Sequence, residues 1–468
     1  MRVRLFLLAG ALAAFGASLG SGFHFDDYAI FAGPLRIFDL HQTRPLTYLT
    51  FWLNRQIGGD DPVGYHAVNL LLHLGAILLV YECLRRLLPE RAAWLAAGLF
   101  AIHPIQAEAV NYVWARSILL ASVLCFAALL AWLEGRQWLA VGVFAAALLA
   151  KEECAAFPIL LWVLQKRKTL RPGRLSHYTA MLSLSLAAGI RVMYATVVTP
   201  GAHAGVQAGI SPLNYLAAQS VVILRYLQLL ILPYGFTVDP DVHVSLGLGA
   251  VAWTGLIAAA VWAWRRGQIW FVGGLALLMP SSSIFPAADL AADRRMYLPM
   301  LAFGATGGLL LTRLRTQWIP SAVGVALVVL SVVRTSVWMS DVWLWREAVE
   351  RAPGKVRPKV QLARALPAAQ ALALLNQARA LAPYDPAIAA ETGKVLLAEG
   401  QPEAALEEFG RALALAPADA RNLNNRGVAL HALRQTEAAR QDFLRALQLD
   451  PNFNEARENL AKISPPAP

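Results

Sequence analysis

The chain has 468 residues, of which 57% are hydrophobic and only 15% are charged, and its mean hydropathy is +0.49. Because an ordinary soluble domain carries about 25% charged residues, this composition excludes a disordered chain and a purely soluble protein. Of the formal net charge of +11, residues 1–354 carry +9 and residues 355–468 carry +2. Membrane proteins hold excess Lys and Arg in cytoplasmic loops, so this charge does not indicate a nucleic-acid partner.

Apolar stretches fill residues 3–338 almost without interruption. A bilayer core of about 30 Å needs about 20 helical residues, so the pattern predicts an all-α polytopic membrane domain of about eleven spans over residues 1–340. The expected spans are 3–22, 66–84, 92–110, 117–133, 137–150, 154–165, 175–198, 246–264, 268–285, 297–312 and 319–338. We expect the first to be retained, because Ala17 to Gly20 is a poor signal-peptide cleavage site.

The segment 213–232 is long enough to span but carries Arg225 near its middle. If it spanned, the basic residues at 265–266 and 313–315 would move to the outer side, against the positive-inside bias. We therefore expect an interfacial or re-entrant segment. The outer loops are then 24–64 and 199–245, with the interfacial helix inside the second.

The tail after residue 340 is charged, rich in Ala and Leu, and repetitive. Pro383, Pro417 and Pro451 are 34 residues apart, and Phe409 and Phe443 keep the same spacing. This period is typical of tetratricopeptide repeats, in which small residues let two helices approach and proline ends the second helix. The sequence predicts a linker over 341–354 and a tetratricopeptide α-solenoid over 355–468. A helical array without this repeat geometry is the alternative.

The unusual polar clusters all fall at the predicted outer membrane face. They comprise Asp26, Asp27, His103, Glu108, Arg116, Lys151, Glu152, Glu153, Arg225, Asp293, Arg294, Arg295 and Tyr297. Ionisable groups at membrane depth are expensive, so their collection on one face indicates a shared cavity.

Each cluster also has a structural interpretation. The acidic pair can cap a helix, and a histidine before a proline can end one through local hydrogen bonds. Lys151 and its neighbours can anchor a span at the interface, and Arg225 can extend its guanidinium to the headgroups. Arg294 and Arg295 lie at the predicted outer face, where the positive-inside bias disfavours positive charge. Their position therefore favours a functional role.

The motifs FDDYAIF, HPIQAEAVNYVWARSILL, LLAKEECAAFPILL, RYLQLLILPYGFTVDPD, ADRRMYLPM and VWLWREAVERAP, followed by the repeats, resemble the transmembrane, tetratricopeptide-repeat-containing O-mannosyltransferases and their bacterial relatives. The resemblance implies a GT-C-fold glycosyltransferase with a polyprenyl-phosphate-linked sugar donor and a catalytic carboxylate in the first outer loop. The sequence departs from the family in its shorter repeat array and in HPIQAEAV, which replaces the more usual HPVHTEAV.

A hydroxyl nucleophile needs a base, and a lipid phosphate leaving group needs fixed cations. Neighbouring residues of an extended segment point to opposite sides, so one aspartate is expected to face the sugar. We favour Asp27 as the base over Asp26, and the choice stays open. The expected donor-phosphate ligands are Arg225, Arg294, Arg295 and Lys151. The expected substrate-positioning residues are His103, Glu108, Arg116, Glu152 and Tyr297.

The predicted activity is inverting sugar transfer to a hydroxyl acceptor, with protein Ser or Thr favoured. The expected partners are the lipid-linked donor, membrane lipids and an acceptor polypeptide bound by the repeats. No cofactor is assigned, and a divalent metal stays an alternative. We expect a bacterial inner-membrane protein with site and repeats on the extracytoplasmic side. The rival functions are a non-catalytic scaffold and a polymerase, ligase or transporter of lipid-linked glycans.

Overall fold

The computed structural model describes residues 1–31, 42–166, 169–170, 173–198, 205, 209–287, 289–316 and 318–463. The described chain is helical and divides into two compact units. The first unit comprises Met1–Val238 and Val242–Ser340, and the second comprises Asp239–Asp241 and Asp341–Pro468. The all-α fold predicted from the sequence is confirmed.

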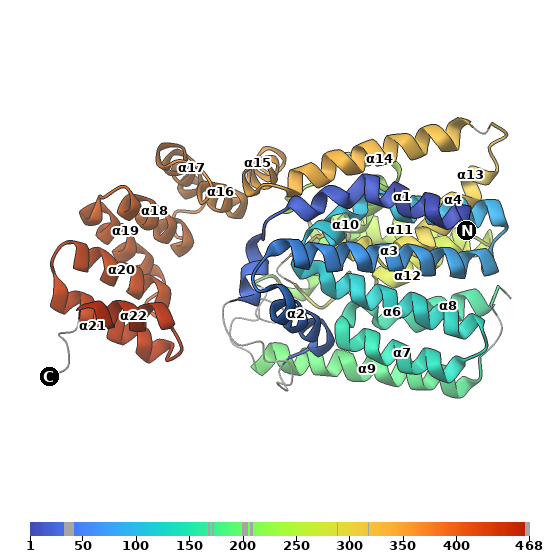
Figure 1. The fold of residues 1–468 in the computed structure, drawn as a ribbon, viewed down its shortest axis with the longest axis horizontal. Helices are drawn as coiled ribbons and strands as arrows, with labels where there is room; N and C mark the ends of the chain where they lie inside the picture. The colour runs from blue at the N-terminus through green and yellow to red at the C-terminus, as the bar shows by residue number, and fades with distance from the viewer. Residues whose placement is uncertain are drawn as a thin grey trace. The chain divides into compact units, whose positions relative to one another are not determined.

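The first unit is a helical bundle in which α1, α3, α6, α7, α9 and α14 run alongside one another (Figure 1). Its helices are α1 (Arg2–Phe15), α2 (Pro45–Gly58), α3 (Pro62–Leu87), α4 (Glu90–Ile102), α5 (Ala107–Asn111), α6 (Arg116–Leu133), α7 (Gln137–Ala150), α8 (Phe157–Lys166), α9 (Leu175–Val198), α10 (Pro212–Ile231), α11 (Leu246–Arg265), α12 (Ile269–Leu278), α13 (Met300–Thr312) and α14 (Trp318–Trp338). Short 3-10 helices η1 (Gly16–Gly20), η2 (Phe25–Ile30), η3 (Pro104–Gln106), η4 (Val113–Ala115), η5 (Glu152–Ala156) and η7 (Asp293–Met296) join them.

Seven helical stretches among the described residues are long and apolar enough to cross a membrane, and α7, α12 and α13 are shorter apolar helices. The longest, α3, has 26 residues and is therefore about 39 Å long. Proline occupies its first position, and the side chain of Asp61 caps it by accepting from Val63 N at 3.0 Å. The chain is an integral, multi-pass membrane protein.

Two expected spans end earlier than the sequence indicated. The span placed at 92–110 stops at Ile102, because Pro104 restricts His103 to an extended conformation (φ −74°, ψ 131°). Residues 103–115 instead form η3, α5 and η4. The span placed at 268–285 stops at Leu278, shortly before Pro280. Both corrections add polar chain to the same end of the bundle.

Close antiparallel packing of α4 and α13 fixes which helix ends lie together. A Cβ atom added at Gly304 would lie 3.1 Å from the carbonyl oxygen of Ala96, and one added at Gly308 would lie 2.5 Å from that of Ala92. The end of α4 thus lies beside the start of α13. We call this end of the bundle, formed by residues 20–31, 42–62, 102–116, 150–157 and 279–300, the polar end.

The first and the last turns of helix α10 both contact the polar end of the bundle. Near its start, the Tyr215 hydroxyl donates to the carbonyl of Ser281 at 2.9 Å, and near its finish the carbonyl of Leu230 lies 3.3 Å from His103 Nε2. Ser281 follows α12 and His103 follows α4. By length and composition α10 could cross a membrane. Its contacts nevertheless favour the interfacial interpretation of 213–232.

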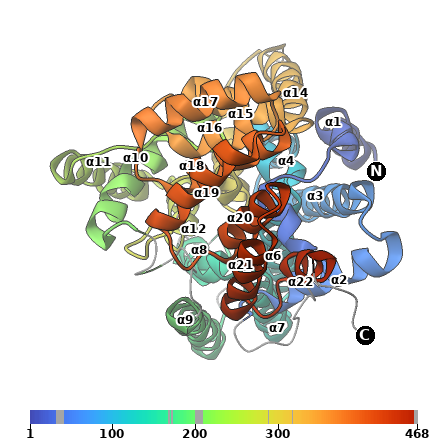
Figure 2. The ribbon, with the colours of Figure 1, turned by 90° about the vertical axis from the view of Figure 1, so that its left-hand side faces the viewer.

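The second unit is a stack of paired helices that follow one another in chain order (Figure 2). Its helices are α15 (Asp341–Arg351), α16 (Val356–Ala363), α17 (Ala368–Leu381), α18 (Pro386–Ala398), α19 (Pro402–Leu415), α20 (Ala420–Ala432), α21 (Thr436–Leu449) and α22 (Asn454–Ile463). The segment 341–354, expected to be a linker, thus contains α15.

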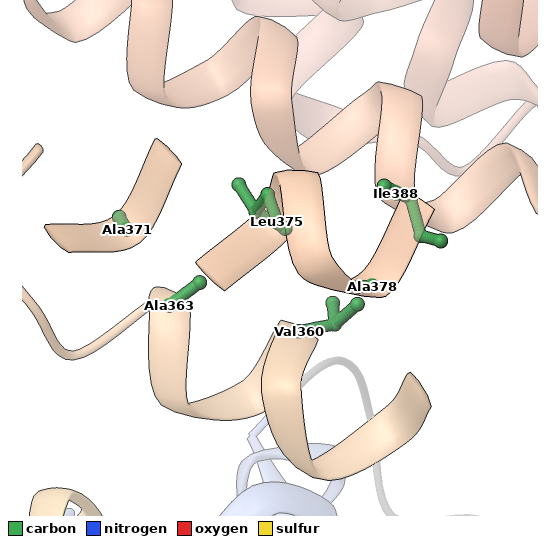
Figure 3. Close-up of a cluster of buried hydrophobic side chains, with 6 residues drawn as sticks. All are labelled: Val360, Ala363, Ala371, Leu375, Ala378 and Ile388. Atoms are coloured by element: carbon green, nitrogen blue, oxygen red, sulfur yellow. The ribbon is translucent and has the colours of Figure 1, made fainter. Parts of the chain in front are cut away.

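The repeat geometry follows from glycine and phenylalanine at fixed positions. Cβ atoms added at Gly393 and Gly427 would lie 2.7 Å and 2.6 Å from the rings of Phe409 and Phe443. The aromatic ring of each second helix therefore fills the space left by the glycine of the first. In the degenerate first repeat, Val360 and Ala363 of α16 lie beside α17, and the cluster is completed by Leu375, Ala378, Ala371 and Ile388 (Figure 3).

We expect Gly308→Ala to lower the melting temperature of the detergent-solubilised protein, because its Cβ would also lie 2.8 Å from that of Ala96 and force α4 and α13 apart. Such overpacking costs about 1–3 kcal/mol. Gly142→Ala on α7 is the matched control, because a Cβ there meets nothing within 4 Å. Equal melting temperatures for the two variants would contradict the close-packing argument.

Candidate active site at the polar end

The segment that follows α1 is tied to two distant parts of the bundle. Its Asp27 is fully buried, with Oδ2 accepting from His24 N at 2.9 Å and Oδ1 accepting from Trp114 N at 2.7 Å. His24 Nε2 donates to the carbonyl of Trp338, the last residue of α14, at 2.6 Å. Burial raises the pKa of Asp27 to about 7, although both N–H donors oppose the rise. Asp27 thus fastens η2 to η4.

Asp26 is exposed, and its Oδ2 accepts from the Tyr112 hydroxyl at 3.0 Å. The segment is not extended, contrary to the expectation from the sequence, because both aspartates lie in the 3-10 helix η2. The two differ in burial: each oxygen of Asp27 accepts a main-chain N–H inside the fold, whereas the Asp26 carboxylate is exposed.

Arg294 lies next to Tyr112, with its Cζ atom 5.8 Å from the centre of the ring. Its guanidinium donates to Glu108 through Nη1 and to Asp289 Oδ2 through Nη2 at 2.9 Å. Its backbone N–H also donates to Glu108 Oε2, at 3.2 Å. Glu108, expected to position substrate, therefore positions Arg294, and two carboxylates already balance the charge of this arginine.

Arg225 of α10 is paired in the same way. Its Nη1 donates to Asp293 Oδ1 at 2.5 Å, and its side chain is 16% exposed. The pair joins α10 to η7. The structure thus brings Arg225, Arg294 and Glu108 together, but as internal ion pairs.

A cavity of about 670 Å³ lies at the polar end between α9, α10 and η5. Its charged lining residues are Arg44, Glu152, Glu153 and Arg295. Arg44 and Glu152 form a bidentate pair, Nε to Oε2 at 3.1 Å and Nη2 to Oε1 at 2.6 Å. Burial alone would raise the pKa of Glu152, but Arg44 outweighs it and, with Lys151, lowers this pKa to about 2.

Arg295 differs from Arg44, Arg225 and Arg294 in its partners. Its Nη1 and Nη2 donate to the main-chain carbonyls of Leu290 at 3.1 Å and Asp289 at 2.7 Å. Carbonyl oxygens orient a guanidinium without cancelling its charge. The side chain is therefore a pre-oriented cation in the wall of the cavity.

Lys151 lies beside this cavity wall, 3% exposed, with Nζ 3.3 Å from Glu153 Oε1. Burial lowers its pKa to about 8, against the attraction of Glu153, and the charges of Arg44 and Arg294 lower it further. This mutual repulsion shows that the cations lie within electrostatic range of one another. The positive charges of Arg44, Lys151 and Arg295 outnumber the negative charges of Glu152 and Glu153. The net positive charge of this region favours an anion.

Three expected substrate-positioning residues lie in the packed interior. His103 accepts from Ile105 N at 3.1 Å and caps η3. Arg116, fully buried, donates to Asn69 Oδ1 at 3.0 Å and to the carbonyl of Tyr65 at 2.9 Å. The Tyr297 hydroxyl lies 2.8 Å from His73 Nδ1. These contacts hold helices together, which is the structural interpretation of a polar residue at a helix end.

Sequence reasoning did not single out Arg44, Tyr48, Tyr112, Tyr215 or Asp289. Arg44 had a usable signal in its position, because it lies directly before the proline that starts α2. The sequence gives no signal for a functional role of the three tyrosines, because an aromatic residue near a span end is more often an interface anchor.

Two families of known sequences match the chain. The family described as dolichyl-phosphate-mannose-protein mannosyltransferase matches residues 42–191, and the tetratricopeptide repeat matches residues 420–453. The first range contains Arg44, Glu108, Lys151 and Glu152, and the second contains α20 and α21.

Curated relatives carry the same description. Protein O-mannosyl-transferase Tmtc1 of Drosophila melanogaster is 46% identical over 120 residues, 23% of this chain and 14% of the relative. Tmtc3 of the same organism is 33% identical over 187 residues, which are 32% of this chain and 20% of the relative. TMTC3 of Mus musculus is 40% identical over 93 residues, which are 20% of this chain and 10% of the relative. The matched parts thus span a fifth or less of these relatives, and the predicted family resemblance is confirmed.

Among solved structures, the first tetratricopeptide domain of the human RPAP3 protein is 23% identical and has a TM-score of 0.23, covering 24% of this chain and 91% of that one. MamA from Desulfovibrio magneticus is 25% identical and has a TM-score of 0.24, and the match covers 26% of this chain and 71% of that one.

We expect Glu152→Gln to destabilise the protein by about 1–3 kcal/mol, because Arg44 keeps its charge but loses its counterion. Since the pKa of Glu152 is lowered to about 2, the carboxylate stabilises the fold fully above its ordinary value of 4.5. This contribution disappears as the pH falls toward 2. Melting curves of both proteins should therefore differ at neutral pH and converge in acid.

The matched control is Glu437→Gln, which breaks the solvent-exposed pair with Arg440 on α21. Exposed ion pairs contribute little to stability, so this variant should have the same melting temperature as the wild type. A neutral-pH melting temperature for Glu152→Gln equal to that of the control would show that the Arg44 pair is not structural.

Proposed function

We propose that this protein is an inverting membrane glycosyltransferase of the GT-C type. It moves a sugar from a polyprenyl-phosphate-linked donor to a Ser or Thr hydroxyl of a polypeptide on the extracytoplasmic face. The observation that carries this proposal is the cavity with Arg295 in its wall, at the end of the bundle that also bears the exposed carboxylate of Asp26. The mannosyltransferase family match over residues 42–191 supports the reaction class.

The acceptor hydroxyl oxygen forms a bond to the anomeric carbon while the bond from that carbon to the phosphate oxygen breaks. Asp26 accepts the hydroxyl proton, and polyprenyl phosphate leaves with the bonding electron pair. One displacement inverts the anomeric configuration. Tyr112 orients the Asp26 carboxylate by donating a hydrogen bond to one of its oxygens, at 3.0 Å.

The growing charge on the leaving phosphate requires cations that are already in place. Arg295 meets this requirement best, because main-chain carbonyls orient it and leave its charge available. Lys151 and Arg44 add positive potential beside it. Arg225 and Arg294 are assigned a positioning role, because Asp293, Glu108 and Asp289 already balance their charges.

The tetratricopeptide unit is proposed to hold the acceptor. Repeats of this kind form an extended concave surface suited to a polypeptide. A chain that lacks 355–468 is then expected to keep donor hydrolysis and to lose transfer to protein. The proposal also requires the polar end and the repeats to face the compartment opposite the cytosol.

Asp26→Asn should lower sugar transfer at least about 100-fold, because the amide cannot accept the hydroxyl proton. Its melting temperature should stay unchanged, since Asp26 is exposed. Asp27→Asn should instead lower the melting temperature, because an amide offers one acceptor oxygen to two N–H donors. Transfer by Asp26→Asn at the wild-type rate, in a lipid-linked sugar assay, would remove Asp26 from the mechanism.

Arg295→Met should raise the KM for the lipid-linked donor about tenfold or more, which corresponds to losing about 1.5–3 kcal/mol of charged hydrogen bonding. Arg55→Met is the matched control, because Arg55 belongs to the same end of the bundle but lies outside the cavity lining, next to Asp60. An unchanged donor KM in Arg295→Met would make this arginine structural.

A further inference from the structure

An apolar groove of about 360 Å³ lies between α1, α4 and α14, which pack against one another. Its floor is formed by Leu7, Leu95 and Leu327, whose side chains are buried. Its rim includes Phe6 and Val325, which are 65% and 67% exposed. The groove therefore opens sideways, on the surface of the bundle that faces the hydrocarbon of the bilayer.

The length of the groove matches the depth of one membrane leaflet. Along α14 its lining runs from Pro320 to Val329, which is about 14 Å at the helical rise of 1.5 Å per residue. Half of a hydrocarbon core of about 30 Å has nearly the same depth. Gly324 leaves room within this stretch, because a Cβ atom there would meet nothing within 4 Å. The groove thus has the dimensions of a site for an acyl chain of a single leaflet.

The mouth of the groove lies at the end of the bundle opposite the polar end. Helices α1, α4, α12 and α14 all finish at the polar end, so their first residues lie at the opposite one. Helix α13 runs antiparallel to α4, so its last residues lie there too. We call this opposite end, formed by residues 1–4, 85–92, 265–268 and 312–316, the basic end. The groove is lined by the halves of α1 and α14 that are nearest to it.

Three arginines without a counterion flank the mouth. Arg2 lies one helical turn before the first groove residue of α1, and Arg313 and Arg315 directly follow α13. All three are exposed, and in the part of the chain that the structure describes none of them forms an ion pair with a carboxylate. Arg4, by contrast, donates to Glu82 at 2.9 Å. The charge at the mouth is therefore complementary to a lipid phosphate.

Aromatic rings mark the same depth. The rings of Phe6 and Trp94 lie beside each other in the groove lining, with their centroids 6.1 Å apart. Trp318, at the start of α14, is 69% exposed. Tryptophan is enriched where the hydrocarbon of a bilayer meets its headgroups. The mouth of the groove thus lies at headgroup level, with the apolar lining below it.

We infer that this groove binds an anionic phospholipid of the leaflet at the basic end. One acyl chain lies between α1, α4 and α14, and the phosphate lies among Arg2, Arg313 and Arg315. This structural lipid is separate from the polar end and does not depend on the proposed function. It holds α14 against α1 and α4, and the last residue of α14, Trp338, contacts His24 at 2.6 Å.

Gly324→Phe tests the apolar half of the site, because the added ring fills the groove. We expect the delipidated wild type in detergent to bind phosphatidylglycerol about tenfold more tightly than phosphatidylcholine with the same chains, and Gly324→Phe to weaken phosphatidylglycerol binding about tenfold. Native mass spectrometry measures both affinities. Gly255→Phe on α11 is the matched control, because a Cβ there also meets nothing within 4 Å but lies outside the groove. Equal affinities of the two variants, or of the two lipids for the wild type, would overturn the site.

Arg313→Gln combined with Arg315→Gln tests the charged half. We expect this double variant to reduce the preference for phosphatidylglycerol to less than about threefold. Arg265→Gln with Arg266→Gln removes the same charge from the basic end, away from the groove, and should keep the wild-type preference. An equal loss in both double variants would show that only the general positive potential attracts the lipid. Displacement of the lipid by inorganic phosphate would also contradict the proposal, because the acyl chain then contributes nothing.

Crosslinking of the wild type in vesicles does not depend on how the variants fold. The probe is phosphatidylglycerol with a diazirine in the middle of one acyl chain. Labels on peptides covering 6–10, 94–102 and 320–329, reduced by excess phosphatidylglycerol but not by phosphatidylcholine, support the site, and labels elsewhere overturn it. Oxidation of Val325→Cys to a disulfide between two chains would also overturn it, because a second copy of the protein then covers the groove.

Discussion

The polar end depends on one constraint, the cost of removing charges from water. Desolvating an ion in a protein costs several kcal/mol unless a partner compensates it. The arginines of the site meet this cost in two ways, by pairing with carboxylates, as Arg44, Arg225 and Arg294 do, or by donating to main-chain carbonyls, as Arg295 does. Only the second way leaves the positive charge uncompensated by a carboxylate. This difference, together with its place in the cavity wall, is why Arg295 is proposed as the ligand of an anionic group.

Much of this organisation could be predicted from the sequence. The 34-residue period of Pro383, Pro417 and Pro451 indicated the repeats, because each repeat packs the same glycine against the same phenylalanine. The gathering of charged residues at one end of the bundle followed from their positions next to span ends. The charge balance of the loops predicts an interfacial segment at 213–232, and this stays a prediction.

The roles of individual residues could not be predicted, because they depend on partners far away in the chain. The sequence favours Asp27 as the base, yet one oxygen of Asp27 accepts the backbone N–H of Trp114, 87 residues later. Arg116 looks like a surface cation in sequence, yet Asn69 and Tyr65 enclose it. Burial of this kind arises from tertiary packing, which no local pattern of residue types encodes.

The contact between His24 and Trp338 has a consequence for biosynthesis. These residues are 314 positions apart, so the loop bearing the acidic pair emerges from the ribosome long before its anchor on α14 exists. The loop can reach its final shape only after the last helix of the bundle has been inserted. A nascent or truncated chain that ends before α14 therefore holds the acidic pair only through Tyr112 and Trp114, and the contact with Trp338 is added last.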